Sequence, residues 1–210
     1  MSYRLYGARG SGSLIVESAL AELDVPYEIH DLDMRGGEQH SDAYRRINAN
    51  GKIPTLQLGD AEPLSESLAI VLTLDERHPE GALLPSPGSP ERAVALRWMS
   101  RLATELYPLI ELVDHPERFV DDAPAALRER ALETWRSRWL HLERELPPAG
   151  DGLLGRFCAA DLYVAVLSRW DMPEAWRKEH LVRVERITAA VRARPRVDAV
   201  WRRHYGPAGG

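Results

Sequence analysis

The chain has 210 residues, of which 44% are hydrophobic and 28% are charged, and its formal net charge at neutral pH is -5. A chain of this length and composition buries a substantial core, which excludes intrinsic disorder. The acidic balance gives no broad positive field, so we expect no binding to nucleic acid.

Targeting and metal-binding signals are missing from the sequence. Charged residues interrupt the apolar stretches before they reach the roughly 18 residues of a membrane span, and no signal-peptide apolar core follows Met1-Ser2-Tyr3-Arg4. We therefore expect a cytoplasmic protein that does not contact a membrane. The single cysteine, Cys158, cannot form an internal disulfide, and no histidine pair has metal-ligand spacing, so neither a metal site nor a redox dithiol is expected.

The first part of the chain alternates between strand and helix patterns. A strand is expected over residues 3–6, a glycine-rich loop over 7–13, a helix whose apolar stripe is Val16, Ala19, Leu20 and Leu23, and a second strand over 27–32. A loop or short irregular helix is expected over 35–46, then an antiparallel hairpin of residues 55–58 and Leu64 around Gly59-Asp60, then a helix over 65–77. The order βαβ then ββα predicts a thioredoxin-like domain over residues 1–78.

Prolines at 79, 85, 87 and 90 mark a linker over residues 79–90. Beyond the linker no strand pattern occurs, and five segments have helical spacing: 91–113, 125–146, 159–169, 181–193 and 196–204. The predicted fold class is therefore α/β plus all-α, with an all-helical second domain over residues 91–210.

Two motifs resemble the glutathione-site signature of the cytosolic glutathione transferases. They are Asn50-Gly51-Lys52-Ile53-Pro54-Thr55-Leu56 and Leu64-Ser65-Glu66-Ser67-Leu68-Ala69-Ile70, and the resemblance extends through the linker to Gly155-Arg156-Phe157-Cys158-Ala159-Ala160-Asp161. Features of the beta, theta and zeta classes are mixed, so no class is assigned.

The resemblance implies how glutathione would be held. A cis Ile53-Pro54 bond would leave the Ile53 main chain free for the cysteinyl backbone, and Glu66 and Ser67 would bind the γ-glutamyl ammonium and carboxylate. Gln39, His40 and Lys52 match residues that reach the glycine carboxylate. The alternatives are a trans proline beginning a strand, a plain helix start with Ser65 as N-cap, and a solvated His40.

The first loop must supply the donor that holds the thiol of glutathione as a thiolate. Gly10 stands where the family has a catalytic serine, and Gly12 stands where the beta class has its cysteine. Ser11 and Ser13 are therefore the preferred candidates, with Ser13 also capping the first helix, and Tyr6 is the third. The alternatives are a tight turn with a capping Ser13 and a packed tyrosine.

By the same resemblance, Tyr107 and Trp170 line the pocket for the electrophile, although core packing explains them nearly as well. Cys158 and Asp161 occupy the positions of an N-terminal capping box. Because a thiol is a weak acceptor, that box is expected to be half weakened, and both residues are interpreted as structural rather than catalytic.

The leading hypothesis is a glutathione transferase that conjugates the thiolate to a small hydrophobic electrophile. The alternatives are a zeta-like glutathione-dependent isomerase and a non-catalytic glutathione- or ligand-binding module, which the two glycines favour. The resemblance also implies a homodimer that uses the helix after Glu66 and the helix from Glu91.

Overall fold

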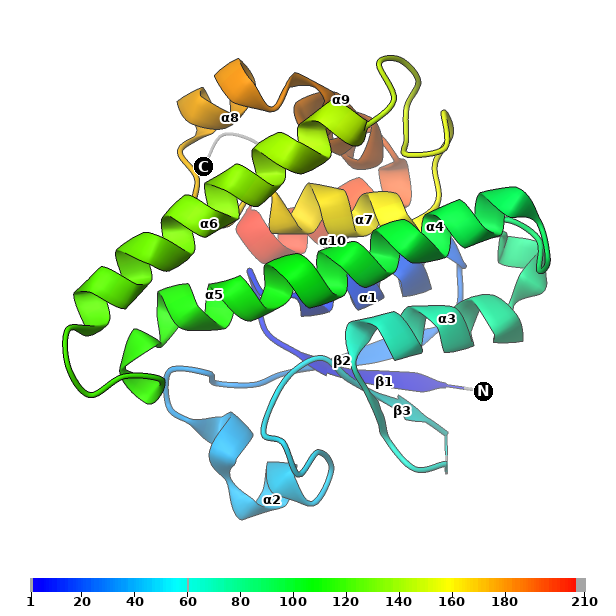
Figure 1. Ribbon diagram of the computed structural model, residues 1–210. Coiled ribbons are helices and arrows are strands. Elements are labelled where there is room, and N and C mark those ends of the chain that lie inside the picture. The colour runs from blue at the N-terminus through cyan, green and yellow to red at the C-terminus, as the bar shows by residue number, and fades with distance from the viewer. Residues whose placement is uncertain (1, 60, 207–210) are drawn as a thin grey trace. The chain divides into compact units, whose positions relative to one another are not determined.

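The computed structural model describes residues 2–59 and 61–206 (Figure 1). It divides into two compact units. One holds the described residues up to Leu84 together with those from Arg192 onward, and the other spans Pro85–Val191. In the described part of the chain no helix is long and apolar enough to cross a membrane.

The first unit is built on a four-stranded mixed sheet. Its elements are β1 Tyr3–Gly7, α1 Ser13–Glu22, β2 Tyr27–Asp31, α2 Asp42–Arg45, β3 Thr55–Leu58, β4 Leu64–Ser65, α3 Ser67–Arg77 and α10 Pro195–Tyr205, with short 3-10 turns at Glu38–His40 and Pro79–Gly81. The strand order is β2-β1-β3-β4, with β1 parallel to β2 and antiparallel to β3. This topology confirms the predicted thioredoxin-like domain.

The sheet register brings the ends of β1 and β4 together with the start of β3 at one edge of the sheet. Tyr6 at the end of β1 pairs with Thr55 at the start of β3, and Thr55 pairs with Ser65 at the end of β4. On the face that α1 and α3 cover, Leu5 and Leu56 are fully buried, while α2 lies on the other side of the sheet (Figure 1). The predicted hairpin turn at Gly59-Asp60 is only partly visible, because Asp60 lies outside the described residues.

Helix α10 differs from the prediction in its partner. The sequence placed residues 196–204 in the helical second domain, whereas α10 packs against α1 in the first unit. Val197, Val200 and Trp201 are buried. Arg194 and Arg203 form ion pairs with Glu22 and Glu17 of α1. Apolar spacing predicts a helix from local sequence, but it does not determine which distant surface covers the apolar face.

The second unit is helical. Its elements are α4 Pro90–Arg101, a π-helix Leu102–Leu106, α5 Tyr107–Asp114, a 3-10 turn Pro116–Arg118, α6 Pro124–Glu145, α7 Ala159–Leu167, α8 Glu174–His180 and α9 Val182–Arg192. No strand occurs among residues 85–206. The sequence analysis missed α8, since most of the residues Glu-Ala-Trp-Arg-Lys-Glu-His are charged and leave no apolar stripe.

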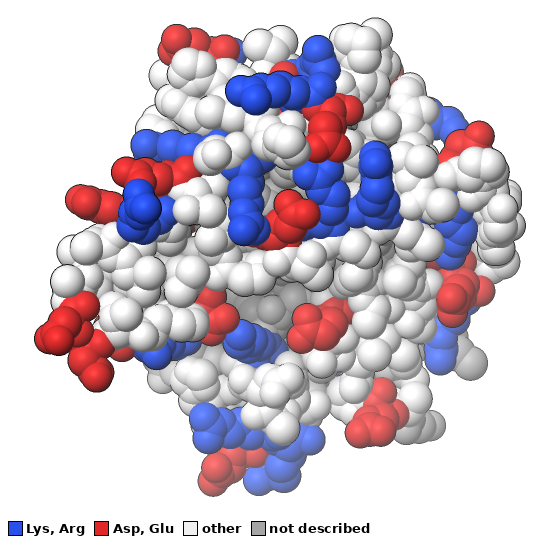
Figure 2. All heavy atoms as spheres, in the orientation of Figure 1, with Lys and Arg blue, Asp and Glu red and all other residues white. Residues whose placement is uncertain are grey.

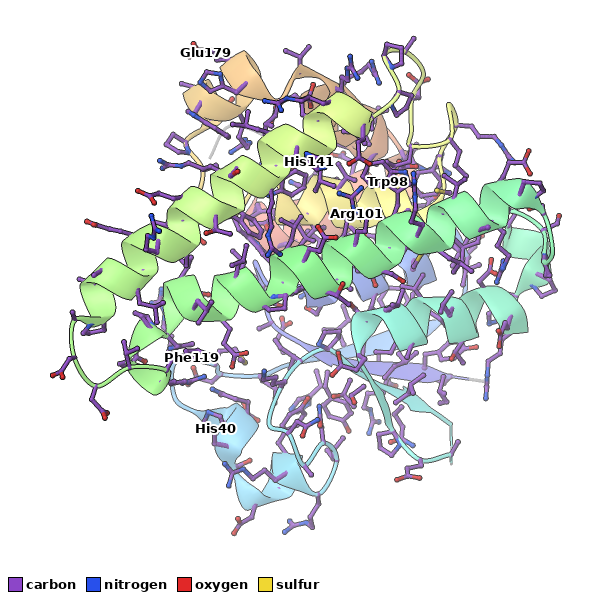
Figure 3. The ribbon with its side chains drawn as sticks, viewed as in Figure 1. His40, Trp98, Arg101, Phe119, His141 and Glu179 are labelled. Atoms are coloured by element: carbon purple, nitrogen blue, oxygen red, sulfur yellow. The ribbon has the colours of Figure 1, made fainter. Side chains whose placement is uncertain are left out.

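An ion pair connects α4 to α6, and each of its partners makes a further contact within its own helix. Arg101 lies 2.6 Å from the Glu145 carboxylate, and its guanidinium carbon lies 5.4 Å from the centre of the Trp98 ring. His141 lies 2.9 Å from the same carboxylate, and Figure 3 shows Trp98, Arg101 and His141 on these neighbouring helices. The hydrogen bond from Arg101 holds the pKa of Glu145 below its usual range. Basic and acidic side chains accordingly interleave on this face (Figure 2).

The capping box of α7 is complete. The Cys158 N–H donates to Asp161 at 2.7 Å, and the Cys158 thiol accepts a bond from the Asp161 main chain. Asp161 also accepts the Leu153 N–H at 2.7 Å and is fully buried. Burial raises the pKa of the Cys158 thiol to about 12. Both residues therefore have structural roles, and the box keeps both of its bonds although a thiol is a weak acceptor.

Candidate functional site

Three pieces of the first unit meet at the edge where β1 and β4 end and β3 begins. They are the glycine-rich loop between β1 and α1, the Ile53–Pro54 segment before β3, and the start of α3 after β4. Because the register aligns these positions, the loop, the proline segment and the helix start are neighbours despite their separation in sequence. The candidate site is built at this edge.

The Ser13 hydroxyl is turned into the loop. It accepts the Ala8 N–H at 3.2 Å and lies 3.1 Å from the Ala8 carbonyl, and Ser13 is fully buried. The prediction that Ser13 caps α1 is wrong: the N-cap is Gly12, which makes no side-chain bond, and Ser13 is the first helical residue. The hydroxyl points to Ala8 because Gly7 has no Cβ there; a Cβ would lie 2.5 Å from the Ser13 oxygen.

Ser11 is better placed than Ser13 to act on a ligand. It is half-buried and donates to the Ala8 carbonyl at 2.7 Å, and its oxygen lies 2.9 Å from the Ser13 hydroxyl. Since Ser13 also reaches the Ala8 carbonyl, the Ser11 proton can turn to another acceptor without leaving that carbonyl unpaired. We find no bond from the Gly12 N–H to any described residue. The loop therefore offers one hydroxyl and one main-chain donor at the N-terminus of α1.

Tyr6 packs among other aromatic rings. Its ring centre lies 5.3 Å from that of His30 and 5.8 Å from that of Tyr44. Alternation along β1 places it on the face opposite the buried Leu5. These contacts favour the packing interpretation, and a catalytic role for Tyr6 stays a prediction.

The Ile53–Pro54 peptide bond is cis, as the resemblance implied. The carbonyl before it, that of Lys52, accepts bonds from the Tyr44 hydroxyl and the Asn48 amide, each at 2.8 Å. Both side chains also reach the Thr55 hydroxyl, at 2.9 and 3.0 Å. The Ile53 main chain makes no hydrogen bond to a described residue, so its N–H and C=O are open to a ligand.

Tyr44 and Asn48 are supporting residues that the sequence analysis did not identify. Both are buried, with exposed fractions of 2% and 7%. A single sequence does not show which polar side chain will form hydrogen bonds to the main chain of a nearby loop. The nearest signal is the polarity of Asn48, three residues before Gly51.

The start of α3 is uncapped and strained. Glu66 has φ 67° and ψ 111°, a region that side-chain-bearing residues rarely adopt, and α3 begins at the next residue, Ser67. No side chain of a described residue caps the helix, and its first turn carries the positive end of the helix dipole, which attracts an anion. The alternative with Ser65 as N-cap is wrong, because Ser65 belongs to β4.

Gly51 brings three of the predicted residues together: it precedes Lys52 in the chain and packs against Gln39 and His40. Gly51 has φ 59°, and a Cβ on it would lie 2.8 Å from the Gln39 carbonyl and 3.0 Å from the His40 ring nitrogen. His40, labelled in Figure 3, and Lys52 are exposed. The Gln39 side-chain oxygen is buried without a hydrogen-bond partner among the described residues. This acceptor can therefore pair with a donor of a bound molecule.

Tyr107 and Trp170 belong to the helical unit and contact each other. Their ring centres are 5.6 Å apart in an edge-to-face arrangement, and both residues are half-buried. Tyr107 follows directly on the π-helix Leu102–Leu106, a rare element that is frequent at functional sites. Their partial exposure leaves both the substrate and the packing interpretation open.

Known proteins resemble this chain in sequence. Residues 13–77 match the N-terminal domain of glutathione S-transferases. The chain is 29% identical over 205 residues to the GST-like protein YncG of Escherichia coli, covering 96% of this chain and 98% of that protein. These matches support a member of the cytosolic glutathione S-transferase family.

Two further relatives add detail. A maleylacetoacetate isomerase of Dictyostelium discoideum is 40% identical over 106 residues, which is 50% of this chain and 48% of that protein. The structure of a glutathione transferase homologue from Sulfitobacter, solved with bound glutathione, has a TM-score of 0.85 at 24% identity and covers 95% of this chain and 96% of that one. The similarity to the Sulfitobacter structure establishes the fold of this chain.

Within this transferase fold the first loop is distinctive. Glycine occupies positions 10 and 12, and the loop contains no cysteine, so any sulfur chemistry there must use the thiol of a ligand. Among the described residues, no group of three histidine, cysteine or acidic side chains is arranged to hold a metal ion.

Proposed function

We propose that the chain binds glutathione at the sheet edge of its first unit and conjugates the thiolate to a small hydrophobic electrophile. One juxtaposition carries this proposal: an open Ile53 main chain beside the strained start of α3, next to a loop that carries the Ser11 hydroxyl and the Gly12 N–H. Each part offers what one section of the tripeptide needs.

The γ-glutamyl group carries both charges of an amino acid. The Ser67 hydroxyl and the first N–H groups of α3 suit its carboxylate, and the Glu66 carboxylate suits its ammonium. The strain at Glu66 supports this assignment, because such backbone conformations concentrate at ligand sites.

The rest of glutathione has matching partners. The N–H and C=O of Ile53 can pair with the cysteinyl backbone in the manner of an added strand. Lys52 and His40 can face the glycine carboxylate, and the orphaned Gln39 oxygen can accept an N–H of the peptide. The cysteinyl sulfur is then directed toward the first loop.

For the chemical step, Ser11 is the preferred donor to sulfur, assisted by the Gly12 N–H and the dipole of α1. Stabilising the thiolate lowers the thiol pKa from its usual value near 8.5, so that a larger fraction is nucleophilic at neutral pH. The thiolate attacks an electrophilic carbon, the new C–S bond forms and the leaving group departs with its electron pair. Tyr107 and Trp170 are our candidates for contacting the electrophile.

A second candidate reaction is isomerisation. The local identity of 40% to a maleylacetoacetate isomerase favours it. In such a reaction the thiolate would add to an activated double bond and leave again, so that the same thiol site serves both activities. A non-catalytic glutathione-binding module is the third outcome.

The test is calorimetric titration of glutathione into the parent and into Ser67→Ala, with aryl-halide conjugation and maleyl-acid isomerisation assays on the same samples. Losing a charge-assisted bond of about 1.5 to 3 kcal/mol weakens binding roughly 10- to 150-fold. Ser18→Ala is the matched control, because the Ser18 hydroxyl is buried in the same unit without a partner. A parent protein that binds no glutathione refutes the proposal.

We also propose that the protein is a cytoplasmic homodimer whose interface includes α3 and α4. Val94 of α4 supports this, since it is one of few large apolar side chains that are exposed, at 37%. Light scattering at micromolar concentration should give twice the chain mass, and a strict monomer would contradict the assembly without touching the glutathione proposal.

A further inference from the structure

A buried hydrogen-bonded chain connects α10 to the glycine-rich loop. Glu17 of α1 and His204 of α10 have exposed fractions of 1% and 7%. The Gly10 N–H lies 3.1 Å from Nδ1 of His204, and Nε2 of His204 lies 2.8 Å from the Glu17 carboxylate. Gly10 and His204 are separated by 194 positions in the sequence.

These contacts require one form of the His204 ring. A main-chain N–H only donates, so Nδ1 must present its lone pair to Gly10. The remaining ring proton then sits on Nε2 and donates to the Glu17 carboxylate, which only accepts. The neutral Nε2-H tautomer satisfies both partners. A terminal nitrogen of Arg203 lies 3.0 Å from Nε2, but in this form both are donors, and both donate to the Glu17 carboxylate instead.

His204 is not needed to neutralise Glu17. Arg203 donates to the same carboxylate from Nε at 2.7 Å and also from a terminal nitrogen, and its other terminal nitrogen lies 2.9 Å from Asp31. A forked guanidinium is the stronger charge partner for a buried carboxylate. The contact that only His204 makes is the one with Gly10.

The anchored loop is the one that carries the proposed thiol donors. Gly10 has φ 72°, and a Cβ on it would lie 3.8 Å from the Tyr205 ring, so α10 lies directly beside this turn. Ser11 and Gly12 follow at once in the chain. Fixing the Gly10 N–H therefore fixes the direction from which the Ser11 hydroxyl and the Gly12 N–H approach a sulfur atom.

We propose that His204 is a positioning residue for the thiol site: through its bond to the Gly10 N–H it holds the loop so that Ser11 and Gly12 stabilise the glutathione thiolate. This role rests on the proposed binding of glutathione. The C-terminal helix thus sets the reactivity of a loop near the start of the chain.

Two substitutions separate the two bonds of His204. In His204→Asn the amide oxygen occupies the place of Nδ1 and accepts from Gly10, but the side chain is too short for Glu17. In His204→Gln the amide nitrogen reaches Glu17, and the Gly10 N–H loses its acceptor. Arg194→Gln is the control, because it breaks another ion pair between α10 and α1 that does not touch the loop.

Three readouts are taken on the full chain: the melting temperature, hydrogen exchange of the Gly10 amide without ligand, and the pKa of the bound glutathione thiol from thiolate absorbance. We expect all three variants to melt at lower temperature. Only His204→Gln should exchange the Gly10 amide at least tenfold faster, raise the bound thiol pKa by about one unit and lower kcat about tenfold, with KM for glutathione within twofold of the parent.

The inference is overturned if His204→Gln retains the parent's Gly10 protection and thiol pKa, or if His204→Asn shows the same losses as His204→Gln. A parent that binds no glutathione refutes the proposed function and the thiol role together. A parent that binds glutathione, with an unchanged thiol in His204→Gln, overturns this inference alone.

Discussion

Replacing Asp161 by alanine removes the acceptor of two buried N–H groups at once. The carboxylate accepts the Cys158 and Leu153 N–H groups, each at 2.7 Å, in a fully buried position. A hydrogen bond to a charged group contributes about 1.5 to 3 kcal/mol, so losing both lowers the free energy of unfolding by about 3 to 6 kcal/mol. That is a large fraction of the roughly 5 to 15 kcal/mol that stabilises an ordinary domain.

Asp161→Asn tests the same reasoning more finely. Its single carbonyl oxygen can serve one N–H, while its NH₂ group faces the other, so we expect about 2 to 4 kcal/mol of destabilisation. Urea unfolding followed by tryptophan fluorescence measures both variants. Asp151→Ala, an exposed aspartate in the same loop, is the control and should change stability by less than about 0.5 kcal/mol. A loss below 1 kcal/mol for Asp161→Ala would refute the capping-box account.

Four further outcomes are expected. The Cys158 thiol, with its pKa raised by burial to about 12, should resist alkylation in the native state at pH 9 and react on unfolding. Because the folded state holds its proton longer, this group should lower stability by about 1 kcal/mol per unit as pH rises from about 9 to 12, and the fall in stability should be shallower by that amount in Cys158→Ala. Burial likewise raises the pKa of Tyr27 to about 12, so Tyr27→Phe should remove one phenolate transition near pH 12 from the absorbance titration. Gly51→Ala meets both a positive φ and the Gln39 carbonyl, so we expect a loss of more than 2 kcal/mol by thermal unfolding, and an unchanged melting temperature would contradict that contact. Glu66→Gly relieves the strained backbone and should raise stability by about 1 kcal/mol while weakening glutathione binding, a trade-off that paired calorimetry and unfolding would expose.

The parts of the fold that depend on neighbouring residues were predictable. The strand, loop and helix at the start and the two strands of the hairpin follow from periodicity and turn residues within a few positions of each other. The same holds for most helices of the second unit. Helix α8 was missed because its mostly charged residues carry no apolar pattern.

The candidate site divides in the same way. The motifs around Ile53 and Glu66 point to glutathione because the residues that present the ligand-binding backbone are contiguous in sequence. The direction in which a hydroxyl points cannot be predicted in this way. Ser13 looks like a helix cap in the sequence, and only the close approach of Gly7 and Ala8 directs its hydroxyl into the loop.

The sequence by itself determined the order of most elements and the family signature, and it supplied candidate residues for the three charged groups of glutathione. Only the tertiary structure decided that α10 packs on α1, that Tyr6 faces an aromatic cluster, and that His204 holds the Gly10 N–H. Local propensity acts over a few residues, whereas these contacts join side chains and backbone from opposite ends of the chain, and their partners exist only once the core has brought them together.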